Sequence, residues 1–286
     1  MLQKSCIGQL VEDAPIEVPK NTALHPTDWR PFRVLTSVPD GAESCVRLTF
    51  ALPQSGSSPP TLGLSPGQHL KVRATVEGRA CERAFTPISL PSDPSAFELA
   101  VKAYPQGRVS RHLAQLHPGD TVEMRGPSGS FVYRRAECTY GQRRWNVRWM
   151  ALIGGGSGVT PLVQIAKAAL ADEQDPTQLS LLSCNTTERS IMVRKELEDM
   201  VAAHPKRMAL RFAVTSSDED HWTGMNTPLD LSQDNSRGSL RDILPPTADG
   251  VAAGGCVLVC GPPGFCRAAT DAMATLGFPH DMVIEL

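Results

Sequence analysis

Hydrophobic and polar residues alternate along the first half of the chain, from Phe32 to about Arg143. Three segments in this stretch have an apolar residue at every second position: 46–52, 70–76 and 97–103. A period of two is typical of strands that bury one face, and turn-forming stretches rich in Gly, Pro and Ser separate these strands. One helical pattern, over 108–116, interrupts the series. Short strands with so little helix predict an antiparallel sandwich or barrel.

The rhythm changes from Arg144 onward. Short, continuously apolar runs now alternate with segments of helical spacing, which predicts an α/β domain with a doubly wound parallel sheet. The expected strands are 145–155, 179–184, 209–214, 256–261 and 282–286, and the expected helices are 159–173, 193–204, 240–244 and 264–278. The chain is therefore predicted to have a polar tail over 1–31, an antiparallel β-barrel domain over 32–143 and an α/β domain over 144–286.

Length and charge agree with this division. At roughly 150 residues per domain, the 286 residues correspond to two domains. The net charge of −2 excludes a polybasic nucleic-acid binder, and we expect no nucleic-acid partner. Residues 1–143 hold 16 Lys and Arg against 13 Asp and Glu, whereas residues 144–286 hold 12 against 17. A basic first half could dock an acidic partner, although an incidental asymmetry of the surface explains the difference equally well.

The eight cysteines are spread thinly, with no Cys-x-x-Cys pair and no spacing typical of a zinc or iron–sulfur site. We therefore expect reduced thiols and no metal site. The first 30 residues lack the basic and apolar regions of a secretory signal, and no apolar run is long enough to cross a bilayer. The sequence thus predicts a protein that is not secreted and lies in the cytoplasm or peripherally on an organelle membrane.

Two glycine-rich turns follow buried strands of the predicted α/β domain. The segment 154–161 reads Gly-Gly-Gly-Ser-Gly-Val-Thr-Pro, and the segment 260–265 reads Cys-Gly-Pro-Pro-Gly-Phe. Glycines in such turns allow backbone amides to approach a phosphate or a ring, but either turn alone also fits a plain structural turn. Both fall at the carboxyl edge of the sheet, where ligands of α/β proteins bind, so together they predict a ligand crevice.

Two segments of the β domain have side chains suited to an anion or a planar ring. Residues 83–89, Arg-Ala-Phe-Thr-Pro-Ile-Ser, supply a cation, an aromatic ring and hydroxyls, which could clamp a phosphate, stack on a ring and hydrogen-bond to its edge. Residues 102–110 contain Lys102 and Tyr104 and then open the predicted helix with Gly-Arg-Val-Ser, a pattern that offers amides, a hydroxyl and a cation to an anion. A surface strand and a capped surface helix would produce the same patterns.

These four segments, in this order, resemble the ferredoxin-NADP reductase superfamily and, within it, the NADH-cytochrome b5 reductase family. The flavin motif of that family, Arg-x-Tyr-Thr-Pro-x-Ser, corresponds to 83–89, and its nucleotide-domain motifs correspond to 154–161 and 260–265. The resemblance covers roughly residues 32–286 and implies an FAD-binding β-barrel followed by an NAD(P)H-binding α/β domain. It further implies a monomeric FAD-dependent enzyme that passes electrons from NADH to cytochrome b5 or another haem protein.

The resemblance also implies roles for individual residues. The FAD pyrophosphate would be held by Arg83 and by Gly107, Arg108, Val109 and Ser110. The isoalloxazine ring would lie against Phe85, with Thr86 near its N5 atom, His69 supporting Thr86, and Thr160 within reach. Further FAD contacts would come from Ala84, Ala100, Lys102 and Tyr104. The nicotinamide would be framed by Gly155, Gly156 and Ser157 and by Cys260, Gly261 and Pro262. The predicted catalytic residues are Thr86, His69 and Cys260.

Three positions near these motifs depart from the family pattern. Phe85 replaces a tyrosine and lacks its hydroxyl, Ala84 replaces a proline, and Leu286 stands where relatives often have an aromatic residue. Stacking on the flavin ring survives the change to Phe85.

The residue that selects NADH departs as well. The family's aspartate falls near Ser216 or Ser217, although Asp218 or Asp220 could take its place. An acidic group there accepts the ribose hydroxyls and repels a 2′-phosphate, which a serine does not do. We therefore expect NADH as the donor and do not exclude NADPH.

Other functions fit the same motifs. One is an NADPH-preferring reductase of the ferredoxin type, or one that feeds an oxygenase, although the absence of iron–sulfur spacing argues against a fused oxygenase reductase. Another is a flavin-binding sensor or interaction module without turnover, which Phe85 and Ala84 would favour.

Overall fold

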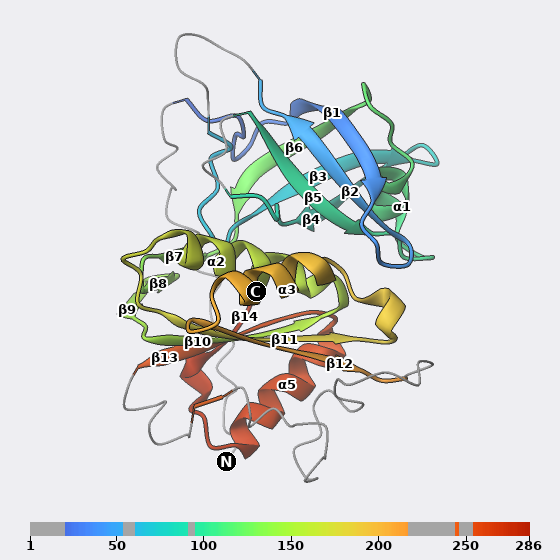
Figure 1. Cartoon of the computed structure of the whole chain (residues 1–286). Helices are drawn as coiled ribbons and strands as arrows, with labels where there is room; N and C mark the ends of the chain where they lie inside the picture. The colour runs from blue at the N-terminus through green and yellow to red at the C-terminus, as the bar shows by residue number, and fades with distance from the viewer. Residues whose placement is uncertain (1–20, 54–60, 91–94, 217–243, 246–253) are drawn as a thin grey trace, which may run out of the picture.

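The computed structural model describes residues 21–53, 61–90, 95–216, 244–245 and 254–286. An antiparallel sheet of six strands forms the first part, in the order β4-β3-β6-β1-β2-β5 (Figure 1). Its strands are β1 (Arg30–Pro39), β2 (Cys45–Ala51), β3 (His69–Val76), β4 (Arg79–Phe85), β5 (Ala96–Lys102) and β6 (Thr121–Ser128). Helix α1 (Arg108–Ala114) packs against β3, β4 and β5. The predicted β-barrel domain is therefore confirmed in class.

Alternating side chains of these strands fill the barrel core. Phe32, Phe50 and Phe97 are almost fully buried, and the Phe97 ring lies 5.5 Å from that of Phe32 and 5.3 Å from that of Phe50. Aromatic pairs at this spacing add to the stabilisation that burial provides. The predicted period of two is what brings these side chains to one face.

The second part is a parallel sheet of five strands in the order β12-β11-β10-β13-β14. Its strands are β10 (Trp149–Gly155), β11 (Gln178–Asn185), β12 (Met208–Val214), β13 (Gly255–Cys260) and β14 (Val283–Glu285). Helices α2 (Val159–Ala171) and α3 (Arg194–Ala203) cover the face toward the barrel, and α5 (Pro263–Thr275) covers the opposite face (Figure 1). This arrangement confirms the predicted doubly wound α/β class, with strand order reversing about β10.

A small antiparallel sheet joins the two parts, formed by β7 (Phe131–Arg134), β8 (Glu137–Tyr140) and β9 (Arg143–Asn146). Phe131, Tyr133 and Cys138 share a core with helices of the α/β unit. The Tyr133 hydroxyl also hydrogen-bonds to Asp175 and Thr177, at 2.5 and 2.9 Å. Most of this sheet comes before the domain boundary predicted near residue 143. Its buried side chains nevertheless pack in the core of the α/β unit.

Some expectations fall outside the described residues: most of the tail 1–31, and the helix over 240–244 except for its last residue. Within the part of the chain that the structure describes, no helix has both the length and the apolar character needed to cross a membrane.

Candidate active site

A cavity of about 670 Å³ lies between the barrel and the α/β unit. Seventeen of the nineteen predicted site residues line it: His69, Arg83, Ala84, Phe85, Thr86, Ala100, Lys102, Tyr104, Gly107, Arg108, Val109, Ser110, Ser157, Thr160, Cys260, Gly261 and Pro262. Segments separated by as many as 193 positions in the sequence, from His69 to Pro262, therefore converge on one place. Because both units contribute, the cavity exists only when they are packed together.

The other two predicted residues, Gly155 and Gly156, do not line the cavity. A Cβ on Gly155 would lie 2.8 Å from the Phe265 ring, so this glycine packs behind the turn. Gly156 has a φ of +55°, a backbone conformation that glycine adopts at little cost. Both residues shape the turn that carries Ser157 rather than contacting the cavity.

The pairing of β3 with β4 places His69 beside Thr86. Leu70 pairs with Phe85 in this antiparallel register, so the preceding residue of β3 lies next to the residue that follows β4. Burial and the nearby Lys71 charge lower the pKa of His69, and its imidazole is therefore neutral at pH 7. This geometry is compatible with the supporting role predicted for His69.

Three cations line the barrel side of the cavity: Arg83, Lys102 and Arg108. Within the described ranges, none of the three has a carboxylate within ion-pair distance. The acidic side chain among the lining residues, Glu285, belongs to the α/β unit. The barrel side therefore has uncompensated positive charge, which suits a ligand with phosphate groups.

A hydrogen bond links the two units across the cavity. The hydroxyl of Tyr104 lies 3.0 Å from Ser157 Oγ. Within the α/β unit, Thr160 Oγ1 donates to the Ser157 carbonyl at 3.1 Å. The Lys102 ammonium lies 5.9 Å from the centre of the Tyr104 ring, within range of a cation–π interaction. Tyr104 is thereby held between the barrel and the turn before α2.

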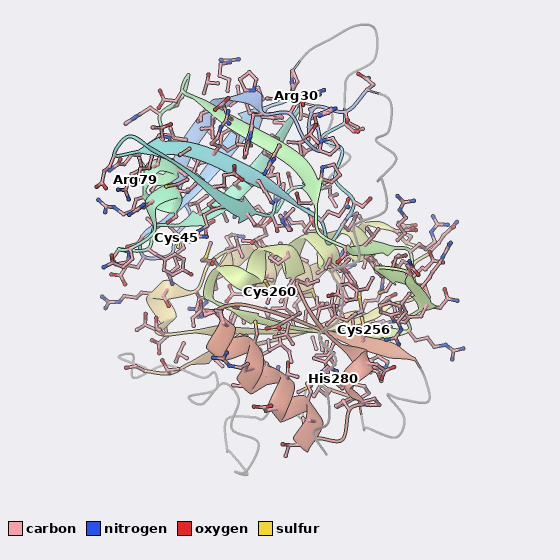
Figure 2. The ribbon with its side chains drawn as sticks, turned by 180° about the vertical axis from the view of Figure 1, so that it is seen from behind. Arg30, Cys45, Arg79, Cys256, Cys260 and His280 are labelled. Atoms are coloured by element: carbon pink, nitrogen blue, oxygen red, sulfur yellow. The ribbon has the colours of Figure 1, made fainter. Side chains whose placement is uncertain are left out.

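The two glycine-rich turns touch each other at the carboxyl edge of the parallel sheet. Gly154 of β10 pairs with Cys260 of β13, and a Cβ on Gly158 would lie 2.1 Å from the Cys260 carbonyl oxygen. No larger residue fits at Gly158 without a backbone shift. Figure 2 shows Cys260 near the middle of the molecule, between the barrel and α5. This is the crevice that the sequence predicted.

The Cys260 thiol is not suited to act as a nucleophile. Burial, together with the charge of Glu285, raises the pKa of Cys260 to about 11, so the thiol stays protonated at neutral pH. A thiolate is the reactive form of cysteine. The thiol lies 3.6 Å from the Leu286 carbonyl, and Cys260 therefore forms part of the cavity wall.

Sequence reasoning did not assign ten further lining residues to the site: Gly67, Gln106, Gly129, Ser130, Phe131, Tyr140, Gly158, Pro161, Glu285 and Leu286. Glu285 could have been found, since it lies next to the end of the last predicted strand, at the same edge of the sheet. Tyr140 comes from β8 and is 42% exposed. No pattern in the sequence indicates that β8 folds back to the cavity.

The residues after β11 and β12 are held together by backbone bonds. The amide of Thr215 donates to the Asn185 carbonyl at 3.1 Å, and that of Ser216 donates to the Thr186 carbonyl at 3.0 Å. Ser216 is exposed, whereas Ser217, Asp218 and Asp220 lie outside the described residues. The residue that would select between NADH and NADPH is therefore not identified by the geometry.

The cavity fits FAD on the chemistry of its donors. Exposed arginines and the hydroxyl of Ser110 are suited to a diphosphate, and the half-buried Phe85 is suited to a planar ring. The glycine turns on the opposite wall leave room for a second ring. These residues could therefore hold a flavin on the barrel side and a nicotinamide on the α/β side.

Comparison with known proteins supports the same division. An oxidoreductase FAD-binding domain matches residues 34–133, and an oxidoreductase NAD-binding domain matches residues 152–271. The structure of the cytochrome b5 reductase domain of Ulva prolifera nitrate reductase superposes with a TM-score of 0.82 at 27% identity, covering 93% of this chain and 100% of that chain.

Two yeast proteins are similar along most of their length. NADH-cytochrome b5 reductase 1 of Debaryomyces hansenii is 33% identical over 258 residues, which is 89% of this chain and 81% of that protein. The Kluyveromyces lactis protein of the same name is 35% identical over 230 residues, 80% of this chain and 74% of its own length. The chain therefore belongs to the NADH-cytochrome b5 reductase family of FAD- and NAD-binding oxidoreductases.

Proposed function

We propose that this protein oxidises NADH and passes the electrons through FAD to cytochrome b5 or a similar one-electron haem acceptor. The observation that carries the proposal is the cavity that both units line, with unpaired cations on one side and two contacting glycine turns on the other. Bound FAD would supply the chemistry, since a flavin accepts a hydride and releases electrons singly. The residues of the chain would bind and orient the two rings.

On this proposal, Arg83 and Arg108 hold the FAD pyrophosphate, and Ser110 adds a hydrogen bond. Phe85 packs against the flavin ring, and Thr86 approaches its reactive edge with the neutral His69 beside it. Tyr104 closes the cavity through its bond to Ser157.

The nicotinamide would lie on the α/β side. Ser157, Cys260, Gly261 and Pro262 line this wall, with Gly155 packed against Phe265 behind it and Gly156 in the turn that carries Ser157. The protonated Cys260 thiol would contribute shape and no proton transfer.

The charge of the first half supports an acidic acceptor, since residues 1–143 hold 16 Lys and Arg against 13 Asp and Glu. The small sheet next to the cavity has three arginines with exposed side chains, Arg135, Arg143 and Arg144, and each of them already pairs with a carboxylate of this chain. Tyr140 of the same sheet lines the cavity. We propose that an acidic haem protein docks over this surface, since opposite charges steer association and salt screens them.

Steady-state rates with NADH and NADPH, each measured with ferricyanide and with cytochrome b5, test the proposal. We expect bound FAD to be bleached by NADH, cytochrome b5 to be reduced, and reduction of cytochrome b5 to slow with added salt while ferricyanide reduction changes little. A salt-independent rate with cytochrome b5 would contradict the docking surface. If FAD binds but neither nucleotide bleaches it, the protein is instead a flavin-binding module without turnover.

We further propose that the protein acts as a monomer in a reducing compartment, the cytoplasm or the surface of an organelle membrane. The seven cysteines that the structure describes are all free, as expected where thiols stay reduced. Light scattering after gel filtration would test the monomer, and cell fractionation would test the compartment.

A further inference from the structure

A second cleft, of about 1250 Å³, lies between the two units, and seven of its sixteen lining residues are charged. The barrel contributes residues around β1, β2 and β5, and the α/β unit contributes α2 and α3. Figure 1 shows these two helices directly below the barrel. None of the residues assigned to the active site lines this cleft.

Arg47 of β2 is the centre of the charge network in this cleft. Its guanidinium donates to Asp40 at 3.0 Å, to Glu196 at 2.8 Å and to Glu98 at 3.4 Å. Burial disfavours the charged guanidinium, but Glu196 and Asp40 outweigh this effect and raise the pKa of Arg47. Because Glu196 belongs to α3 and the other two carboxylates to the barrel side, Arg47 connects the two units.

The same network holds a strained residue at the start of α3. Val193 has φ +49° and ψ +29°, a left-handed conformation that β-branched residues rarely adopt. Its amide donates to Asp40 Oδ2 at 2.9 Å, and the Asp40 side chain is fully buried. Strain of this kind persists where surrounding contacts hold it in place, so the network orients α3 on the barrel.

Lys167 of α2 extends the network to the flavin segment. Its ammonium forms an ion pair with Glu196 and donates to the Ile88 carbonyl at 2.7 Å. Ile88 is the second residue after Thr86, and its own amide donates to the Glu98 carbonyl at 2.9 Å. The position of the strand end that carries Thr86 is thus tied to α2.

A second hydrogen bond from α2 holds the start of the neighbouring strand, β3. Gln164, one turn before Lys167, accepts the amide hydrogen of Gly67 at 2.8 Å and is almost fully buried. Gly67 lies two residues before His69, as Ile88 lies two residues after Thr86. Thr160, Gln164 and Lys167 share one face of α2, because residues three and four apart are neighbours on a helix.

We propose that Lys167 is a positioning residue for hydride transfer, which holds the segment of Thr86 against the helix that carries Thr160. Thr86 of the barrel and Thr160 of the α/β unit both line the active-site cavity, and Lys167 joins their two segments from the second cleft. The proposal rests on the proposed NADH-to-FAD reaction.

Substitution of Lys167→Gln in the FAD-bound protein tests this role, with Lys195→Gln as the matched control. Lys195 lines the same cleft, but its side chain is 85% exposed and pairs with Asp199 one helical turn away. Hydrogen exchange of residues 84–90 and the limiting rate and KM of single-turnover flavin reduction by NADH are measured for each. Hydrogen exchange does not depend on flavin reduction, so it reports on the mobility of residues 84–90 even if NADH does not reduce the flavin.

We expect Lys167→Gln to retain FAD and to reduce it about tenfold more slowly at saturating NADH, because small misplacements of reacting groups have large effects on rate. Its KM should change less, and exchange over 84–90 should rise. Lys167→Arg should restore most of the rate, and Lys195→Gln should match the unaltered protein.

An unchanged limiting rate per bound flavin in Lys167→Gln would overturn the proposal. So would a loss that appears only in FAD content or thermal stability, since that indicates a purely structural contact. If Lys167→Gln fails to fold, Glu196→Gln removes the same ion pair together with the Arg47–Glu196 pair and is judged by the same criteria. Failure of NADH to reduce the unaltered protein would instead contradict the proposed function.

Discussion

The barrel and the α/β unit meet at two clefts in which positive charges are arranged differently. In the active-site cavity, Arg83 and Arg108 have no carboxylate partner within the described ranges. In the second cleft, Arg47 and Lys167 are paired with carboxylates from both units. The unpaired arginines are exposed and remain hydrated, whereas buried charges are costly unless they are paired. Basic residues are therefore available to bind a ligand in the active-site cavity, whereas in the second cleft they connect the two units.

The largest effect on stability is expected from Arg47→Met. This change leaves the carboxylate of Asp40, whose side chain is fully buried, without its cation. Breaking such a pair costs about 3 kcal/mol in the free energy of unfolding, which urea denaturation would measure.

Arg144→Met is the matched control for that measurement, since its ion pair with Glu137 is exposed to solvent. Exposed pairs contribute little, and we expect no resolvable change. If the two variants lose the same free energy of unfolding, the buried ion pairs of Arg47 between the units do not stabilise the protein more than an exposed ion pair does.

A smaller and more local effect is expected from Arg83→Gln. The change removes a charge-assisted bond to the proposed pyrophosphate, and loss of such a bond weakens binding by about 10- to 100-fold. Titration of the apoprotein with FAD, followed by flavin fluorescence, gives the Kd. The free energy of unfolding without FAD should change little, because Arg83 is exposed.

Arg79→Gln controls for the loss of charge from the same strand. Arg79 begins β4 and lies at the edge of the barrel, away from Cys260 (Figure 2). Its substitution should leave the Kd for FAD unchanged. If both variants weaken FAD equally, the net charge of the barrel matters and the position of Arg83 does not.

The smallest effect is expected from pH. Burial and Lys71 lower the pKa of His69 in the folded protein, so the unfolded chain binds more protons as pH falls below about 6.5. Stability should therefore be fully present above that pH and decrease as the pH falls toward the folded-state pKa.

Urea denaturation at pH 7.5 and 5.5, carried out on the unaltered protein and on His69→Asn, would measure the contribution of His69 to the pH dependence of stability. The loss of stability at the lower pH should be smaller in His69→Asn than in the unaltered protein. If both proteins lose the same free energy, His69 does not titrate differently on folding, and its half-buried position in the cavity has no electrostatic consequence.

Much of the fold could be predicted from local patterns. The segments 70–76 and 209–214 are strands β3 and β12 almost as expected, and 159–173 contains α2. Their periodicity arises from neighbouring residues that share one buried face. The small sheet β7–β9 was not predicted as part of the α/β unit, because its strands have four residues each and packing decides which core such short segments join.

Some residues of the candidate site could likewise be predicted from local motifs, and others could not. Glycine turns and the Arg83–Ser89 segment indicate their chemistry through residue type and order, and seventeen of the predicted residues line one cavity. Tyr140 has no such signature, because it reaches the cavity through the folding of a short strand that no sequence motif marks. Gly155 and Gly156 belong to the predicted glycine-rich motif but do not line the cavity.

By itself, the sequence determined the classes of the two parts, their order and the segments that line the cavity proposed to hold flavin and nicotinamide. These features depend on residues that are close in the chain, where periodicity, turn geometry and motif spacing act. Only the tertiary structure decided which charges pair, since Arg47 and Glu196 are 149 positions apart. It also decided that α2 joins Thr86 to Thr160 through Lys167, because such contacts form only once the two units pack and exclude water between them.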